Sequence, residues 1–76
     1  MRELVEFLAR SLVDTPDAVT VDEVEAEGRT VCEIRVAPGD VGKIIGRGGR
    51  VIGAIRVLAS ASALKSGRRA HIEVVS

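Results

Sequence analysis

The residues best suited to chemistry in this sequence are the glycines and cations between positions 42 and 52. Four glycines fall within eight residues, and three cations, Lys43, Arg47 and Arg50, are interleaved with them. Glycine has no Cβ, so a second backbone can approach closely and φ can become positive. Arginine and lysine donate hydrogen bonds to phosphate oxygens. A glycine loop that carries cations between two apolar segments therefore predicts contact with a phosphate backbone.

A nucleotide cofactor fits these glycines poorly. A P-loop requires G-x-x-x-x-G-K-[ST], and no glycine here is followed by Lys-Ser or Lys-Thr. Gly46, Gly48 and Gly53 loosely match a dinucleotide fingerprint, but the segment before them contains Asp40 and Gly42 and is predicted to be a helix instead of a strand. The acidic residue required about 20 positions further on is also missing. We therefore expect no cofactor.

Little in the sequence supports catalysis. His71 is the only histidine and has the outward parity of a predicted strand, so we interpret it as solvated. Cys32 has the buried parity of another strand, which favours a small core residue over a nucleophile. No Cys/His cluster is present to hold zinc, and the acidic residues of positions 14–33 fall on turns and outward strand positions. We expect neither an enzyme nor a small-molecule substrate.

Length and charge limit the classes of protein further. A chain of 76 residues predicts one domain, residues 1–76, which buries only about 60% of its unfolded surface. No apolar run approaches the ~20 residues that cross a bilayer, and one cysteine fits a reducing compartment, so we expect a soluble, cytoplasmic protein. Residues 1–40 contain four basic and ten acidic residues, whereas residues 41–76 contain seven basic residues and one acidic. Charges divided in this way between two halves are usually just solvated surface residues. Here the basic half also holds the glycine loop, which favours an anion-binding face.

Apolar periodicity predicts the elements that position this loop. Apolar residues at helical spacing precede Pro16 and form a stripe that Phe7 widens, and we expect Phe7 to pack in the core. Residues 18–26 alternate as a strand does. A bulge near Asp22 would bring Val24 and Ala26 to the same buried side as Val19 and Val21. Asp40 is a predicted N-cap for a short helix that ends at the glycines. The predicted helices are residues 2–13, 41–45 and 49–66, and the predicted strands are residues 18–26, 30–37 and 70–75.

Two apolar stripes run along the last predicted helix, which Gly67 should end. One stripe, of Ile52, Ile55, Ala59 and Ala63, should cover the sheet. The other must meet the first helix or a partner chain, and it consists of Ala54, Val57, Ala61 and Leu64, with Leu58 between the two stripes.

The order α-β-β-α-α-β predicts an α+β fold. Residues 27–29 should form a hairpin turn between the first two strands, and two helices provide a crossover long enough for parallel pairing of the last strand. The result is a three-stranded mixed sheet with helices packed on one face.

Residues 44–52 match the KH-domain signature (V/I)-I-G-x-x-G-x-x-I, with Gly46, Arg47, Gly48 and Gly49 as its G-x-x-G loop. The element order resembles a type II KH domain along the whole chain. In length and motif position the chain is similar to the small bacterial KH-domain RNA-binding protein family called KhpA or YlqC.

The resemblance implies that the loop clamps about four nucleotides of single-stranded RNA. Arg47 is the expected phosphate contact, while Gly48 adds no charge, which departs from relatives with two polar middle residues. Bases would lie in an apolar groove formed by the loop helices and the last strand, with about half of Ile44, Ile45, Val51 and Ile52 facing the sheet instead. The residues expected to bind RNA are Lys43, Ile44, Ile45, Gly46, Arg47, Gly48, Gly49, Arg50, Ile52, Arg68, Arg69 and Ile72.

The implied function is a post-transcriptional regulator or RNA chaperone that contacts single-stranded RNA. The alternative is an interaction module whose KH fold mainly binds protein through the surplus apolar stripe. For partners, the resemblance implies a homodimer or a heterodimer with a larger multidomain KH protein of the KhpB or Jag type, and no membrane.

Overall fold

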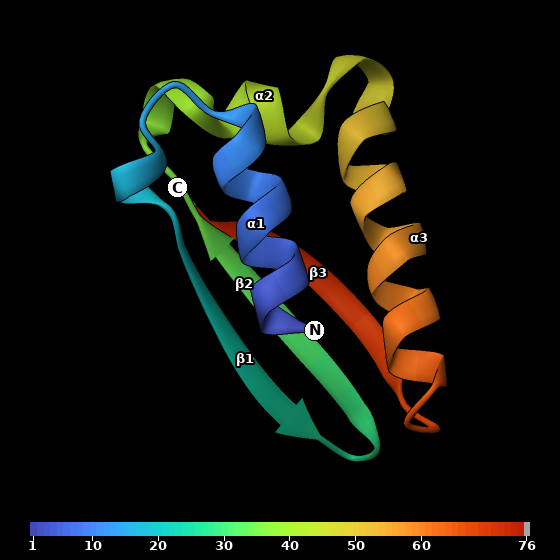
Figure 1. Cartoon of the computed structure of the whole chain (residues 1–76). Helices are drawn as coiled ribbons and strands as arrows, with labels where there is room; N and C mark the ends of the chain where they lie inside the picture. Colours follow the sequence, from blue (N-terminus) through green and yellow to red (C-terminus); the bar gives the residue numbers. More distant parts are fainter. Residues whose placement is uncertain (76) are drawn as a thin grey trace.

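A three-stranded mixed sheet carries its helices on one face, as the sequence predicted (Figure 1). The computed structural model describes residues 1–75. In chain order the main elements are α1 (Arg2–Leu12), β1 (Thr20–Ala26), β2 (Arg29–Arg35), α2 (Val41–Ile45), α3 (Arg50–Leu64) and β3 (Arg69–Val75). Strand β2 lies in the centre, antiparallel to β1 and parallel to β3. None of the helices within residues 1–75 has the length and apolar character needed to cross a bilayer.

The hairpin between β1 and β2 sets the register of the sheet. Glu27 and Gly28 form its two-residue turn with φ values of 48° and 79°, and Ala26 pairs with Arg29 directly across it. Positive φ at both turn positions is typical of a type I′ hairpin, whose twist matches that of the strands. Pairing then continues without interruption to Thr20. The predicted bulge is therefore wrong, and Val24 lies on the open face with 51% of its surface exposed.

Alternation along β2 separates the core from the open face. Thr30, Cys32 and Ile34 point to the helices and are buried, and the side chains between them lie on the other face. Burial raises the pKa of the Cys32 thiol, and the negative charge of Glu23 acts in the same direction. Because the thiolate is the reactive form, these causes suppress nucleophilic chemistry, and Cys32 is the buried small residue that was predicted.

Helix α1 contributes a narrower face to the core than predicted. Val5 and Ala9 are fully buried, but Phe7 is 67% exposed, so its predicted core role is wrong. Consecutive helical residues are rotated by about 100°, which places Phe7 roughly 200° from Val5. The sequence after α1 also differs from the prediction: Pro16–Ala18 forms a single 3-10 turn, and β1 begins at Thr20 instead of residue 18.

Helix α3 buries the predicted stripe of Ile52, Ile55, Ala59 and Ala63 against the sheet. The second stripe is exposed and does not pack on α1, so the first of the two predicted neighbours, the first helix, is excluded. The helix ends in a Schellman motif, in which the Arg68 N–H donates to the Ala63 carbonyl at 3.0 Å and the Gly67 N–H donates to the Leu64 carbonyl at 3.0 Å. Gly67 has a φ of 68°, which confirms that it ends the helix.

Candidate nucleic-acid interface

The glycine loop is a sharp bend between α2 and α3 (Figure 1). Gly46 ends α2, and its N–H donates to the Gly42 carbonyl at 2.8 Å. Arg47–Gly49 then forms one tight turn in which Gly48 has a φ of 64° and Gly49 a φ of 78°. The predicted arrangement of a helix, a glycine loop and a second helix is therefore present.

Gly46 is required by contacts within the protein itself. Its φ of 75° and ψ of 169° lie in a backbone region that is essentially restricted to glycine. A Cβ at this position would lie 2.4 Å from Val51 Cγ2 and 2.8 Å from the Val51 nitrogen. A Cβ at Gly48 would meet nothing within 4 Å. The first glycine thus sets the bend, whereas the third position of the loop is open to solvent.

The three cations around the loop differ in what they contact. Arg47 and Arg50 are exposed, and neither forms an ion pair with any residue of positions 1–75. Lys43 Nζ lies 3.3 Å from a carboxylate oxygen of Asp14 and 3.8 Å from one of Asp40. Two of the three cations therefore have no ion-pair partner within residues 1–75, whereas the third already lies within 4.0 Å of two carboxylates.

Asp40 fastens α2 to the end of α1. The residue occupies the N-cap position of α2, but its side chain makes no cap hydrogen bond, which corrects the predicted mechanism. Its buried carboxylate instead accepts the backbone N–H groups of Asp14 at 3.3 Å and Thr15 at 3.1 Å. This contact was not predicted, because the donors are main-chain groups that carry no sequence signal. It holds the helix from which the loop begins.

The apolar residues of the signature divide between core and surface. Ile44 and Ile52 are buried, with 0% and 4% of their surface exposed, whereas Ile45 and Val51 are half-buried beside the core. The predicted split of about half is therefore confirmed. Ile72, on β3, is also in the core at 5% exposure. The side chains of Ile44, Ile52 and Ile72 therefore lie in the core and offer no exposed face to a base, which corrects their predicted role as RNA-binding side chains.

Arg68 and Arg69 are neighbours in sequence but have different surroundings. The Arg68 guanidinium donates from Nε to Thr30 Oγ1 at 3.0 Å and from Nη2 to the Arg29 carbonyl at 3.2 Å, and it lies 3.4 Å from a Glu25 carboxylate oxygen. It therefore ties the last loop to the hairpin. Arg69 is exposed and forms no ion pair within residues 1–75.

A hollow of about 250 Å³ lies between α3 and the start of β3. It contains Ala70, a residue of the last strand, but no residue of positions 43–52 lines it, so it is not the predicted groove between the loop helices and the last strand. Its lining residues are Ser60, Leu64, Arg68, Arg69, Ala70 and His71.

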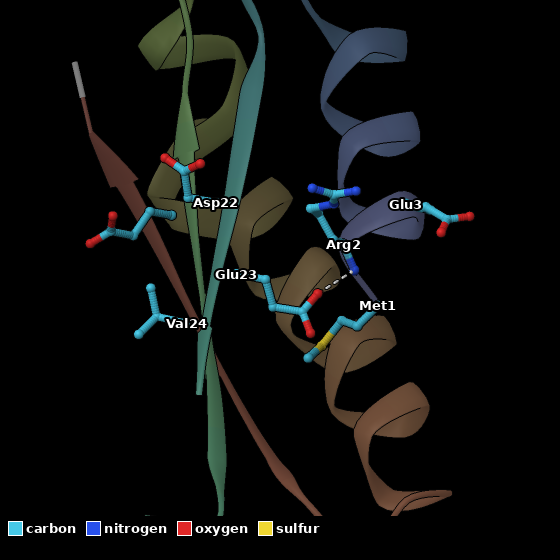
Figure 2. A pocket seen from close by; sticks show the side chains of 7 residues that line it. Met1, Arg2, Glu3, Asp22, Glu23 and Val24 are labelled. Carbon is cyan, nitrogen blue, oxygen red and sulfur yellow. Dashed lines mark hydrogen bonds between the residues drawn. The ribbon is translucent and has the colours of Figure 1, made fainter. Parts of the chain in front are cut away.

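An acidic hollow of about 620 Å³ lies at the opposite edge of the sheet, around β1 (Figure 2). Glu23 turns toward the N-terminus and accepts the Arg2 N–H at 3.2 Å, whereas Asp22 and Val24 point away from the helices (Figure 2). Glu3 and Glu33 complete its acidic lining. Within residues 1–75 no group of acidic, histidine or cysteine side chains is arranged to hold a metal ion. This edge repels anions, so the charge asymmetry of the sequence becomes an asymmetry between the β1 and β3 edges.

Comparison with known proteins identifies relatives along the whole chain. Residues 2–74 match the family model described as "KhpA/KhpB, KH domain". The chain is 47% identical over 75 residues to a protein of Caldanaerobacter subterraneus subsp. tengcongensis named RNA-binding protein KhpA, with 99% of this chain and 100% of the relative covered. It is 49% identical over 73 residues to the protein of the same name in Borreliella burgdorferi, with coverage of 96% and 89%. These are names of RNA-binding proteins, and they agree with the expectation that the chain is not an enzyme.

The fold also matches part of a larger solved structure. A crystal structure of a variant of Aquifex aeolicus Era superposes with a TM-score of 0.69 at 25% sequence identity. The match covers 96% of this chain and 28% of that one. Both the fold and the sequence comparisons thus extend over nearly all of the residues described.

Proposed function

Since this chain belongs to the KhpA/KhpB family of KH domains, we propose that it binds single-stranded RNA and clamps about four nucleotides at the loop Gly46–Gly49. The observation that carries the proposal is the pair of exposed arginines in and next to that loop, Arg47 and Arg50, which form no ion pair with any residue of positions 1–75. Relatives named for RNA binding support it over a purely structural role.

The loop offers three kinds of attraction to a sugar-phosphate backbone. Arg47 and Arg50 supply charge-assisted hydrogen bonds to phosphate oxygens. The first residues of α3 add the positive end of a 15-residue helix, which begins without a side-chain cap. Gly48 leaves open space beside the loop, so a strand can approach the main chain closely. Lys43 contributes less in this proposal, because Asp14 and Asp40 already surround its ammonium group.

Bases would rest on apolar surface instead of aromatic rings. Ile45 and Val51 are the half-buried members of the signature, and Ala70 on β3 lines the hollow opposite α3. Phe7, the only aromatic residue, lies on α1 and not in that hollow. Stacking normally adds about 1–3 kcal/mol per base, so a site without it should bind weakly and with loose sequence preference. Such binding suits a cytoplasmic post-transcriptional regulator or RNA chaperone that contacts many transcripts.

The test is the double substitution of Arg47→Asp and Gly48→Asp. Two carboxylates in the loop should lower the affinity for a short single-stranded RNA at least about tenfold, because they repel the phosphates that the arginine attracted. The affinity is measured by fluorescence anisotropy. Wild-type binding should also weaken with salt, with a log–log slope of roughly −2 to −3 if three or four phosphates are neutralised.

A matched control separates the loop from net charge. Arg2→Asp with Ser11→Asp makes the same change in charge at two exposed positions of α1, and it should leave RNA affinity within about twofold. Circular dichroism checks the folding of both variants. RNA affinity that is unchanged in a folded Arg47→Asp/Gly48→Asp protein would overturn the proposal.

The exposed stripe of α3 favours a second property, pairing of the domain with a second copy or with a larger multidomain KH protein. Val57, Leu58 and Leu64 are 69%, 47% and 71% exposed, and they lie on one helix with Ala54 and Ala61. Two weak RNA sites in one dimer would bind a single transcript with higher avidity than one site.

Pairing predicts a dimer in light scattering at high micromolar concentration, and Leu64→Glu should shift the mass toward the monomer. Phe7→Glu is the matched control, because Phe7 is 67% exposed on α1, and it should leave the mass unchanged. A wild-type protein that stays monomeric at that concentration contradicts self-association, and an equal effect of the two substitutions contradicts the assignment to α3.

A further inference from the structure

The open face of the sheet, on which no helix of residues 1–75 packs, has its charges sorted into rows (Figure 1). Strand register places Asp22, Glu33 and Glu73 side by side across β1, β2 and β3. Arg29 and Arg69 are neighbours in the same way, four residues nearer the hairpin turn. Like charges directly opposite each other on neighbouring strands are destabilising. Both rows therefore cost the separate domain stability, and an opposing surface of opposite charge would offset that cost.

Contacts within the domain offset little of this charge. Arg35 lies 4.0 Å from a carboxylate oxygen of Asp22, but both side chains are more than half exposed, so the pair contributes little. The other four members of the two rows form no ion pair with any residue of positions 1–75. The rows themselves lie about 13 Å apart at the usual rise of a strand, so their charges stay separated.

A third row lies midway between the two charged rows. It consists of Val24, Val31 and His71, which are in register with one another. Val24 is 51% exposed, and Val31 is half-buried although no helix of residues 1–75 covers it. Each charged row is two residues, or about 6.6 Å, from this central row. The face thus has two valines at its centre, a positive row on one side and a negative row at the same distance on the other.

A second copy of the chain presents the surface that complements this pattern. A two-fold axis that runs across the strands at the central row turns the positive row of one copy onto the negative row of the other. Arg29 then faces Glu33 of the second copy. Arg69 likewise faces Glu73 of the second copy, and each contact occurs twice because a two-fold interface is isologous. Sheets packed face to face lie about 10 Å apart with nearly aligned strands, a gap that arginine and glutamate side chains span from both sides.

We propose that the open face of the sheet is a self-association surface, on which two copies pack with β2 antiparallel to β2 and the valines of the central row in contact. This inference depends neither on the proposed RNA binding nor on pairing through α3, which lies on the other side of the sheet (Figure 1). Three strands of seven residues present a face of about 330 Å² per copy. Stable complexes bury about 1,200–2,000 Å² in total, so a pair held by this face alone is weak and forms near millimolar concentration.

The test is a charge exchange in the Leu64→Glu protein, a background that removes pairing through α3. Arg29→Glu with Arg69→Glu makes both rows negative, and Glu33→Arg with Glu73→Arg makes both rows positive apart from one aspartate. Each variant alone should stay monomeric at concentrations where the background protein associates. An equimolar mixture of the two should associate at least about tenfold more tightly than either variant alone, because every contact across the axis then joins opposite charges. Sedimentation equilibrium from micromolar to millimolar protein measures the mass, and added salt should weaken the mixed pair.

A matched control separates this face from net charge. Arg2→Glu with Arg56→Glu makes the same change in charge at exposed positions of α1 and α3 and should leave the association of the background protein within about twofold. Circular dichroism checks the folding of every variant. Backbone amide shifts that change with protein concentration should map to β1, β2 and β3.

Three results would each overturn the inference. The first is a background protein that stays monomeric at millimolar concentration. The second is a mixture of the two charge variants that associates no better than either variant alone. The third is a set of concentration-dependent amide shifts confined to the helices.

Discussion

Replacing Gly46 with alanine is expected to lower the free energy of unfolding by about 2–5 kcal/mol. Two physical effects combine at this position. The backbone dihedrals, φ 75° and ψ 169°, are costly for any residue with a side chain, and the added Cβ would lie 2.4 Å from Val51 Cγ2. The overlap between this Cβ and Val51 can be relieved only if the start of α3 moves away from α2. Because each kcal/mol shifts the melting temperature of a domain of this size by about 4–8 °C, thermal denaturation should detect the change easily.

Gly48→Ala is the control for this prediction. Gly48 also has a positive φ, of 64°, but a Cβ there would meet nothing within 4 Å. Only the cost of the left-handed backbone remains, about 1 kcal/mol. Equal destabilisation by the two substitutions would show that the contact with Val51 is unimportant and that glycine is needed at both positions for its backbone freedom alone.

Asp40→Ala is expected to cost about 2–4 kcal/mol of stability. The buried carboxylate accepts two backbone N–H groups, of Asp14 and Thr15, and lies 3.8 Å from Lys43 Nζ. Its removal leaves these donors without their partner and separates the end of α1 from the start of α2. Urea denaturation measures the loss, which should appear as a lower midpoint with an unchanged slope if the unfolded state is unaffected.

Asp14→Ala provides the comparison for Asp40. The Asp14 side chain is 77% exposed and contacts Lys43 at 3.3 Å, a surface ion pair worth about 0–1 kcal/mol. The two substitutions remove the same group from residues that contact the same lysine. If they destabilised the protein equally, the ion pairs with Lys43 and not the buried hydrogen bonds would explain the role of Asp40.

Local patterns in the sequence were sufficient for the order and type of every main element. Alternation identified β2 and β3, Gly67 identified the end of α3, and the four glycines placed the bend between two helices. These signals are short-range, because strand parity, helix spacing and positive φ depend on neighbouring residues. Predictions failed where an apolar residue was assumed to be buried: Phe7 and Val24 are exposed at 67% and 51%.

The exposed positions show why the core could not be predicted in full. A helix or strand buries only the face that contacts another helix or strand. The width of that face depends on the element packed against it, which the local sequence does not specify. Helix α1 packs through Val5 and Ala9, so Phe7 lies outside the contact. In β1 the unbroken hairpin register keeps Val24 on the open face, opposite the helices.

By itself the sequence determined the glycine loop, its flanking cations and the type II KH order of elements, because each depends on residues close together in the chain. Only the tertiary structure decided which cations are available. Lys43 forms an ion pair with Asp14 from the end of α1, and Arg68 is tied to Thr30 and Glu25 of the hairpin. Arg29 and Arg69 become neighbours only through the parallel pairing of β2 with β3. Charges act through space, so their roles follow from contacts between residues that are far apart in sequence.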